Sequence, residues 1–158
     1  MKKIGIIGGG VWGSALAKLL GSEKVQIYIR DKKIADSINN FKLNPKLKYA
    51  TFSDNVRATT ILKDLENVDY LILALPAQNI KGVLSDFNIS NKNQNIIIAS
   101  KGIDIDSVKF LSEVVYESTK SNNISILSGP CFSHEVAQNL PTAVTLATEN
   151  KTTFESIA

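Results

Sequence analysis

The stretch Ile4-Gly5-Ile6-Ile7-Gly8-Gly9-Gly10-Val11-Trp12-Gly13-Ser14-Ala15-Leu16-Ala17 places three glycines at the spacing Gly-x-Gly-x-x-Gly, between an apolar run and an amphipathic one. Gly8 permits the tight turn out of a buried strand, Gly10 lets the backbone approach a pyrophosphate, and Gly13 lets the next helix pack close to the strand. The unpaired N–H groups and the dipole at the start of that helix stabilise phosphate charge. A purely structural turn leaves the glycine offsets unexplained. The stretch therefore predicts a strand, a turn and a helix that bind a dinucleotide.

The rest of the chain alternates short apolar runs with longer amphipathic ones, which is typical of an α/β protein. We expect buried parallel strands at the short runs 4–7, 25–29, 70–75, 96–99, 124–127 and 143–147. We expect crossover helices at 13–20, 32–39, 60–65, 79–87, 107–118 and 133–139, with Val108, Leu111 and Val115 on one stripe of the fifth. The predicted fold is a doubly wound, mostly parallel sheet of the Rossmann type.

Two stretches of the chain fall outside this alternation of strands and helices. Residues 40–53, which include Asn44-Pro45, are expected to form a surface excursion on the ligand side. Phe154 and Ile157 begin another apolar face close to the last residue. Residues 1–158 are therefore expected to be one dinucleotide-binding domain, cut from a longer protein.

Composition indicates a soluble domain and argues against a nucleic-acid-binding or a membrane-spanning protein. The chain has 158 residues, of which 44% are hydrophobic and 21% charged, and its formal charge of +3 comes from scattered lysines. Such a balance favours anionic small molecules over nucleic acid. A single cysteine, Cys131, fits a reducing compartment, so the cytoplasm is expected. No apolar run approaches the ~20 residues of a membrane span, and neither a signal peptide nor a metal site is expected.

The end of the second expected strand is where such folds choose between NAD and NADP. An acid at that position binds the ribose 2′-hydroxyl of NAD, whereas this chain has Arg30 there, followed by Asp31. An arginine presents a planar, permanently charged fork to a 2′-phosphate. The sequence therefore favours NADPH slightly over NADH. Two alternatives stay open: Arg30 is a solvated surface charge, or Asp31 selects NAD.

Three further strand ends carry candidate residues, and in an open parallel sheet the ligand lies outside these carboxyl ends. Pro76 follows one strand and fixes the direction of the turn, although a plain turn proline would do the same. Lys101 follows the next strand, where an ammonium group can polarise a carbonyl or hold a phosphate; an isolated lysine would be a solvated charge. The segment 128–131 closes another strand and leads into a helix whose N–H groups can meet an anion.

With these strand ends, the chain closely resembles the N-terminal half of the bacterial NAD(P)-dependent glycerol-3-phosphate dehydrogenases. The blocks that carry the resemblance are Gly-Gly-Gly-Val-Trp-Gly-Ser-Ala-Leu-Ala at 8–17, Ala-Ser-Lys-Gly-Ile at 99–103, Leu-Ser-Gly-Pro-Cys-Phe-Ser-His-Glu-Val-Ala at 127–137 and Leu-Pro-Thr-Ala-Val at 140–144. They span almost all of the chain in that family's order and spacing. The resemblance implies reversible reduction of dihydroxyacetone phosphate to sn-glycerol 3-phosphate with NAD(P)H, which supplies phospholipid synthesis.

The resemblance also implies roles for individual residues. Val11 and Trp12 would lie along the cofactor pyrophosphate, Arg30 near the adenosine ribose, and Lys101 where nicotinamide meets substrate. Gly129 and Cys131 would border the substrate, and Ser133 would face the cofactor. Three positions depart from the family's pattern: Val11 stands at a common serine, Cys131 at a usual serine or threonine, and Ser133 at a common alanine.

The 44–48 loop also departs from the family's pattern, and Cys131 allows an alternative reading as a nucleophile. The family's Asn-x-x-Tyr-Leu-Pro segment survives only as Asn44-Pro45-Lys46-Leu47-Lys48, which puts any cofactor contact from this loop in doubt. A thiol is a weaker donor than a hydroxyl, so a direct role of Cys131 is also in doubt. Cys131 with His134 as its base would suggest a nucleophile. Hydride transfer needs none, and His134 is expected on a helix surface.

The resembled family has a second, all-helical domain that provides the proton donor and the residues that grip the substrate phosphate. That domain is expected to be missing from this chain, so the chain alone should bind dinucleotide and be inactive. The resemblance implies that the full-length parent is the enzyme and a homodimer. Two alternatives remain: another NAD(P)-dependent dehydrogenase of a small phosphorylated or carboxylated hydroxy compound, or a non-catalytic NAD(P)-binding module.

Overall fold

The computed structural model describes residues 1–48, 50–89 and 94–157. Its main sheet has the strand order β3-β2-β1-β4-β5-β8-β9. The strands are β1 (Lys3–Ile7), β2 (Lys24–Tyr28), β3 (Val56–Thr59), β4 (Tyr70–Leu73), β5 (Asn95–Ile98), β8 (Ile124–Ser128) and β9 (Thr145–Thr148). The first six in this order pair in parallel, and β9 runs antiparallel to β8.

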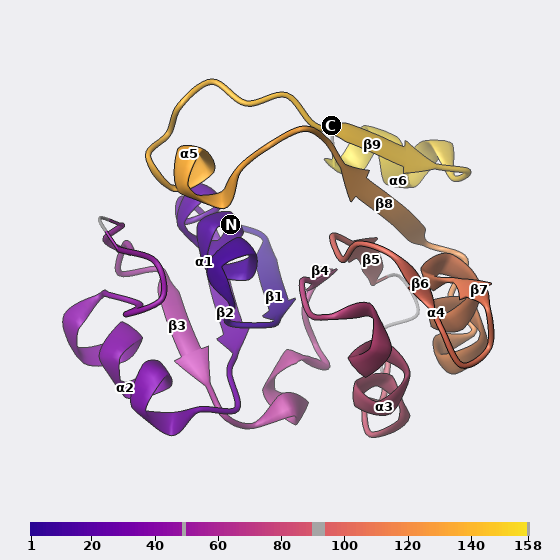
Figure 1. Cartoon of the computed structure of the whole chain (residues 1–158), viewed down its shortest axis with the longest axis horizontal. Helices are drawn as coiled ribbons and strands as arrows, with labels where there is room; N and C mark the ends of the chain where they lie inside the picture. Colours follow the sequence, from indigo (N-terminus) through magenta and orange to yellow (C-terminus); the bar gives the residue numbers. More distant parts are fainter. Residues whose placement is uncertain (49, 90–93, 158) are drawn as a thin grey trace.

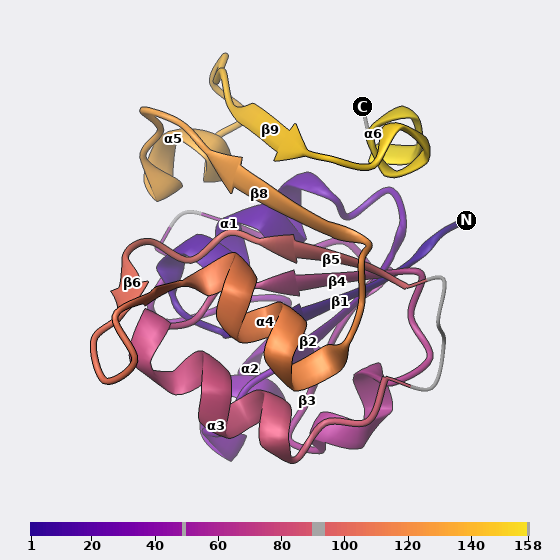
Figure 2. The same ribbon diagram turned by 90° about the vertical axis from the view of Figure 1, so that its right-hand side faces the viewer.

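Helices cover both faces of the sheet, with α1 and α2 on one side and α3 and α4 on the other (Figures 1 and 2). They are α1 (Val11–Leu19), α2 (Lys32–Phe41), α3 (Ile80–Ser85), α4 (Leu111–Thr119), α5 (Ser133–Ala137) and α6 (Lys151–Ile157), with short 3-10 turns η1 (Leu62–Leu65) and η2 (Ala77–Asn79). This arrangement confirms the predicted doubly wound α/β fold.

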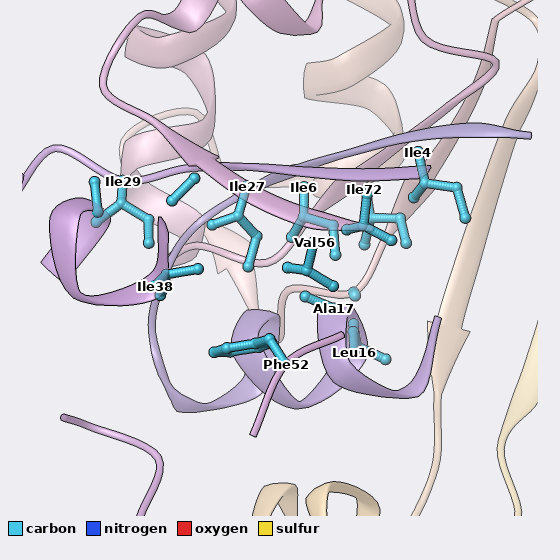
Figure 3. Close-up of a cluster of buried hydrophobic side chains, with 14 of the residues drawn as sticks. Ile4, Ile6, Leu16, Ala17, Ile27, Ile29, Ile38, Phe52, Val56 and Ile72 are labelled. Atoms are coloured by element: carbon cyan, nitrogen blue, oxygen red, sulfur yellow. The ribbon is translucent and has the colours of Figure 1, made fainter. Parts of the chain in front are cut away.

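The core lies in two layers, because successive strand residues point to opposite faces. Ile4 and Ile6 of β1 pack with Leu16 and Ala17 of α1 (Figure 3). Ile7 belongs to the second layer, which is built with residues of β4, β5, α3 and α4. Strands buried on both faces need continuous apolar runs, which is why the central strands were predictable from sequence.

The outer parts of the sheet differ from the sequence-based expectation. The strand at Val56–Thr59 was not predicted, because it is short and carries the exposed Arg57 at the sheet's edge. The run 143–147 was expected to be a buried parallel strand, which is wrong: β9 is antiparallel and half exposed. The direction of β9 depends on where the connection between β8 and β9, which contains α5, brings the chain back beside β8.

The predicted helix over 107–118 begins later, at Leu111. Residues 103–110 form a hairpin of β6 (Ile103–Asp104) and β7 (Lys109–Phe110). Val108 lies outside the helix, 77% exposed and with φ +54°, so its place on the apolar stripe of that helix is wrong. Helix 60–65 shortens to the 3-10 turn η1.

Residues 40 and 41 belong to α2, whereas the described residues from 42 to 53 are irregular and reach the surface, as expected. They are also anchored in the interior. Asn44, Leu47, Ala50 and Phe52 are all buried. Leu47 and Ala50 pack with residues of α1 and α5 in one small apolar cluster. The segment therefore bridges two helices. Within the described ranges, no helix is both long and apolar enough to cross a membrane.

Candidate functional site

Two adjoining hollows lie at the carboxyl ends of the parallel strands. The first, the glycine hollow, has a volume of about 350 Å³ and is lined by Ile7, Gly8, Gly9, Gly10, Tyr28, Ile29, Arg30, Asp31, Ile34, Lys46, Ala74, Leu75, Pro76, Asn79 and Val83. The second, the lysine hollow, has about 270 Å³ and is lined by Trp12, Ala74, Leu75, Pro76, Ala99, Ser100, Lys101, Leu127, Ser128, Gly129, Cys131 and Ser133. They share the segment 74–76, which follows β4 and lies between them. One extended ligand can therefore reach both.

The glycine turn between β1 and α1 has the geometry that the sequence predicted. Gly8 has φ +123°, and a Cβ there would lie 2.3 Å from the carbonyl oxygen of Ala74. A Cβ on Gly13 would lie 2.0 Å from the carbonyl oxygen of Gly8, so the helix packs directly on the turn. A Cβ on Gly10 would meet nothing within 4 Å. The fold thus requires Gly8 and Gly13, whereas the space at Gly10 is open toward the hollow.

The start of α1 leaves donors for an anion. Gly10 is the N-cap residue, with extended backbone and no side chain to cap the helix. The first turn carries no acidic residue. The first N–H groups of a helix have no intrahelical acceptor, and the helix dipole adds positive potential there. This end of the glycine hollow is therefore suited to phosphate.

The end of β2 brings both charges that the sequence singled out to the glycine hollow. Arg30 and Asp31 both line it, and both are exposed. The Oδ1 atom of Asp31 accepts a hydrogen bond of 2.9 Å from the backbone N–H of Lys33, which caps α2. Within residues 1–48, 50–89 and 94–157, the Arg30 side chain makes no hydrogen bond or ion pair. The guanidinium is thus available to an anion at this end of the hollow.

A polar network joins the strand ends beneath the lysine hollow. The hydroxyl of Ser100 donates to the carbonyl of Leu73 at 3.0 Å and accepts from the N–H of Leu75 at 3.2 Å. The indole Nε1 of Trp12 donates to the carbonyl of Ala99 at 3.1 Å. These bonds fix the ends of β4 and β5 relative to α1. They thereby hold Lys101 at the rim of the hollow.

The structure brings most of the predicted site residues together, but in two groups. Gly8, Gly10, Arg30 and Pro76 line the glycine hollow. Trp12, Pro76, Lys101, Gly129, Cys131 and Ser133 line the lysine hollow. Gly13 is buried beneath the turn, and Val11 is 41% exposed and lines neither hollow.

Cys131 and His134 do not form a pair over the hollow. Cys131 lines the lysine hollow, whereas His134 is exposed on α5, with its ring 5.7 Å from that of Phe132. The placement of His134 on a helix surface is confirmed.

Sequence reasoning missed three residues at the glycine hollow. A Cβ on Gly9 would lie 2.2 Å from Cγ1 of Ile29, so this glycine is needed where β2 passes the turn. Asn44 is buried and bonded to the turn, and Lys46 lines the hollow. The signal for Asn44 was present in the resembled Asn-x-x-Tyr-Leu-Pro segment. Nothing in the sequence marked Lys46.

Comparison with known proteins agrees with this geometry. Residues 3–154 match the family described as NAD-dependent glycerol-3-phosphate dehydrogenase N-terminus. A glycerol-3-phosphate dehydrogenase (NAD(P)+) of Neorickettsia sennetsu is 38% identical over 157 residues, covering 97% of this chain and 47% of that protein. One of Clostridium botulinum is 40% identical, covering 95% and 47%.

A solved structure shows the same likeness. The crystal structure of glycerol-3-phosphate dehydrogenase from Coxiella burnetii superposes with a TM-score of 0.89 at 28% identity, over 99% of this chain and 49% of that one. The chain thus spans about half the length of the relatives it matches. Because the family match covers nearly all its residues, the chain belongs to the NAD-dependent glycerol-3-phosphate dehydrogenase family, as an N-terminal cofactor-binding domain.

Proposed function

We propose that the chain binds NAD(P) across the two hollows and supplies the cofactor half of a reaction that interconverts dihydroxyacetone phosphate and sn-glycerol 3-phosphate. The proposal rests on one observation: the two hollows adjoin each other, because residues 74–76 line both of them. A dinucleotide has two nucleotide halves joined by a pyrophosphate. The glycine hollow offers helix donors for the pyrophosphate, and the lysine hollow offers a cation and open space beside it.

In this arrangement the adenosine half lies toward Arg30 and the nicotinamide half toward Lys101. The bound cofactor supplies or accepts the hydride. Lys101 orients the substrate's oxygen atoms against the ring, and Gly129 and Cys131 border the substrate at the same hollow. Ser133 begins α5 and lines the same hollow, where we assign it to the cofactor. Val11 contributes through its backbone N–H, since its side chain is exposed.

We assign NADPH a modest preference over NADH on the position of Arg30. The Asp31 carboxylate, which would favour the ribose 2′-hydroxyl of NAD, also caps α2. We assign the proton donor and the residues that grip the substrate phosphate to parts of the relatives' length that this chain does not span. A homodimeric parent in the cytoplasm completes the proposal.

Calorimetric titration with both reduced cofactors tests the proposal. The chain should bind NADPH and NADH, and Arg30→Ala should weaken NADPH binding by roughly 1.5–3 kcal/mol, the range for a hydrogen bond to a charged group, while NADH binding stays nearly unchanged. Lys32→Ala, one charge removed two residues further on, is the matched control and should change neither. Equal losses for both cofactors in Arg30→Ala would contradict the NADPH assignment. No binding of either cofactor to the wild-type chain would overturn the proposed function.

A further inference from the structure

The buried side-chain amide of Asn44 ties the 44–48 loop to the glycine turn. Asn44 is 2% exposed, and its Nδ2 donates to the carbonyl of Gly9 at 3.2 Å and to the hydroxyl oxygen of Ser14 at 2.7 Å. Its Oδ1 accepts from the backbone N–H of Lys46 at 2.9 Å. Both ends of the amide are therefore engaged. A buried polar group satisfied in this way has one well-defined position, because losing a partner would leave an unpaired group in the interior.

The same contacts fix the backbone of Lys46. The N–H of Leu47 donates to the carbonyl of Asn44 at 2.9 Å, so the chain makes a tight turn after Asn44. Leu47 is 3% exposed and packs in the apolar cluster with α1 and α5. Lys46 thus stands between two buried anchors while its own side chain is exposed and lines the glycine hollow. A loop residue held in this way is placed toward the hollow by the packing of its neighbours.

The charge at Lys46 is available. No carboxylate makes an ion pair with it in the described part of the chain, where the ion pairs involve Lys32, Lys42, Lys109 and Lys151. Lys46 and Arg30 line the same hollow as the glycine turn, and Asp31 is the one acid among the residues that line it. Two free cations against one acid give the hollow a positive balance, which attracts phosphate and strengthens its binding.

We propose that Lys46 is a phosphate contact of the bound dinucleotide and that Asn44 is the positioning residue that holds it there. The inference rests on the proposed function, since it needs the dinucleotide to occupy the glycine hollow. It extends that function by assigning a second cation, from a different element than Arg30. The phosphate is either the ribose 2′-phosphate or the pyrophosphate, and the choice of cofactor separates the two.

The first test measures the dissociation constants of NADPH and NADH for the chain at several salt concentrations. Lys46→Ala should weaken NADPH binding about tenfold, a typical effect for losing one charge-assisted contact, and should make the affinity less dependent on salt. A loss for NADPH alone assigns the 2′-phosphate, and a loss for both cofactors assigns the pyrophosphate; both results support the proposal. Lys48→Ala, an exposed lysine of the same loop outside the hollow's lining, is the matched control and should bind like wild type.

The second test asks whether Asn44 acts through Lys46. Asn44→Ala should lose affinity and salt dependence as Lys46→Ala does, and the double variant should lose no more than the larger single effect, because the two residues serve one contact. Asn44→Ser, whose hydroxyl can still accept from the N–H two residues on, should retain part of the affinity and guards against misfolding of the alanine variant. Additive losses in the double variant would show that Asn44 acts on the turn alone and would overturn its positioning role.

The outcomes separate this inference from the proposed function. If the wild-type chain binds NADPH and Lys46→Ala binds it with the same affinity and salt dependence, the role of Lys46 is wrong and the proposed function stands. If the wild-type chain binds neither cofactor, both are wrong.

Discussion

The glycines of the turn serve two different purposes at the scale of single residues. Gly8 and Gly13 are required by the protein, because a Cβ at either would overlap backbone atoms. Gly10 has an ordinary φ of −71° and open space, so the protein itself does not demand a glycine there. Under the proposed function, the side chain is absent at Gly10 because the pyrophosphate approaches the backbone there.

This distinction predicts opposite outcomes for two alanine substitutions. Gly10→Ala should keep the fold, at a cost below about 1 kcal/mol for the changed N-cap, and should lower dinucleotide affinity at least tenfold, about 1.4 kcal/mol, because the methyl group occupies the phosphate's place. Gly13→Ala, the control, should instead lower the thermal unfolding temperature, since its methyl group meets the carbonyl oxygen of Gly8. Calorimetry and thermal denaturation measure the two effects. Unchanged affinity in a folded Gly10→Ala variant would contradict the phosphate site.

How far the site could be predicted depends on the range of the contacts involved. Gly8, Gly10 and Gly13 lie in one local motif, whose spacing alone indicates their roles. Gly9 is required by Ile29, and Asn44 by Gly9 and Ser14, which are partners from other elements. Those contacts exist only once the sheet and the loop are assembled. The spacing of apolar residues and glycines therefore does not indicate them, and Asn44 is marked only by the resembled Asn-x-x-Tyr-Leu-Pro segment.

Among the elements, the hairpin at 103–110 shows why apolar spacing placed a helix too early. The carboxylate of Asp104 accepts hydrogen bonds from the backbone N–H and the hydroxyl of Ser107, and these bonds hold the pKa of Asp104 below its usual value. The carboxylate of Glu113 accepts from the N–H of Phe110 at 2.8 Å and so starts α4 after it. Side-chain oxygens that bond nearby backbone groups compete with helix formation. The spacing of Val108, Leu111 and Val115 does not contain this information.

Val108 provides a test of the strain in this hairpin. Its left-handed backbone costs a β-branched residue about 1–2 kcal/mol, and its side chain is 77% exposed, so little packing is lost on its removal. Val108→Gly should therefore raise the free energy of unfolding by up to about 1 kcal/mol, after the ~0.5–1 kcal/mol entropic cost of glycine. Val108→Ala retains the left-handed penalty and is the control. A Val108→Gly variant less stable than Val108→Ala in urea unfolding would show that the hairpin carries no such strain.

At the scale of the whole molecule, the burial of the strands decreases from the centre of the sheet to the β8–β9 edge. The central strands β1, β4 and β5 are buried on both faces, and their apolar runs predicted the parallel core. The β8–β9 edge is half exposed, and the chain from α5 passes over the molecule before it returns as β9 (Figure 1). The direction of β9 could not be predicted from its own residues, because it depends on where this long connection brings the chain back.

The length of the chain relative to its relatives bears on catalysis. The chain spans 47% of the length of its relative from Neorickettsia sennetsu, and both hollows lie within it. Reduction of a ketone needs a proton delivered to the forming alkoxide as well as a hydride, and the proposed function assigns that proton to residues that the chain does not span.

Under that division, binding and turnover separate in the 158-residue chain. With saturating NADPH and dihydroxyacetone phosphate, cofactor oxidation followed by absorbance should not exceed the buffer rate, although calorimetry on the same sample shows the cofactor bound. The full-length Neorickettsia sennetsu relative, assayed at equal concentration, is the positive control and should turn over. Oxidation by the chain at the rate of that control would place the complete catalytic apparatus within these residues. Lys101, the cation at the rim of the lysine hollow, would then have to deliver the proton rather than orient the substrate.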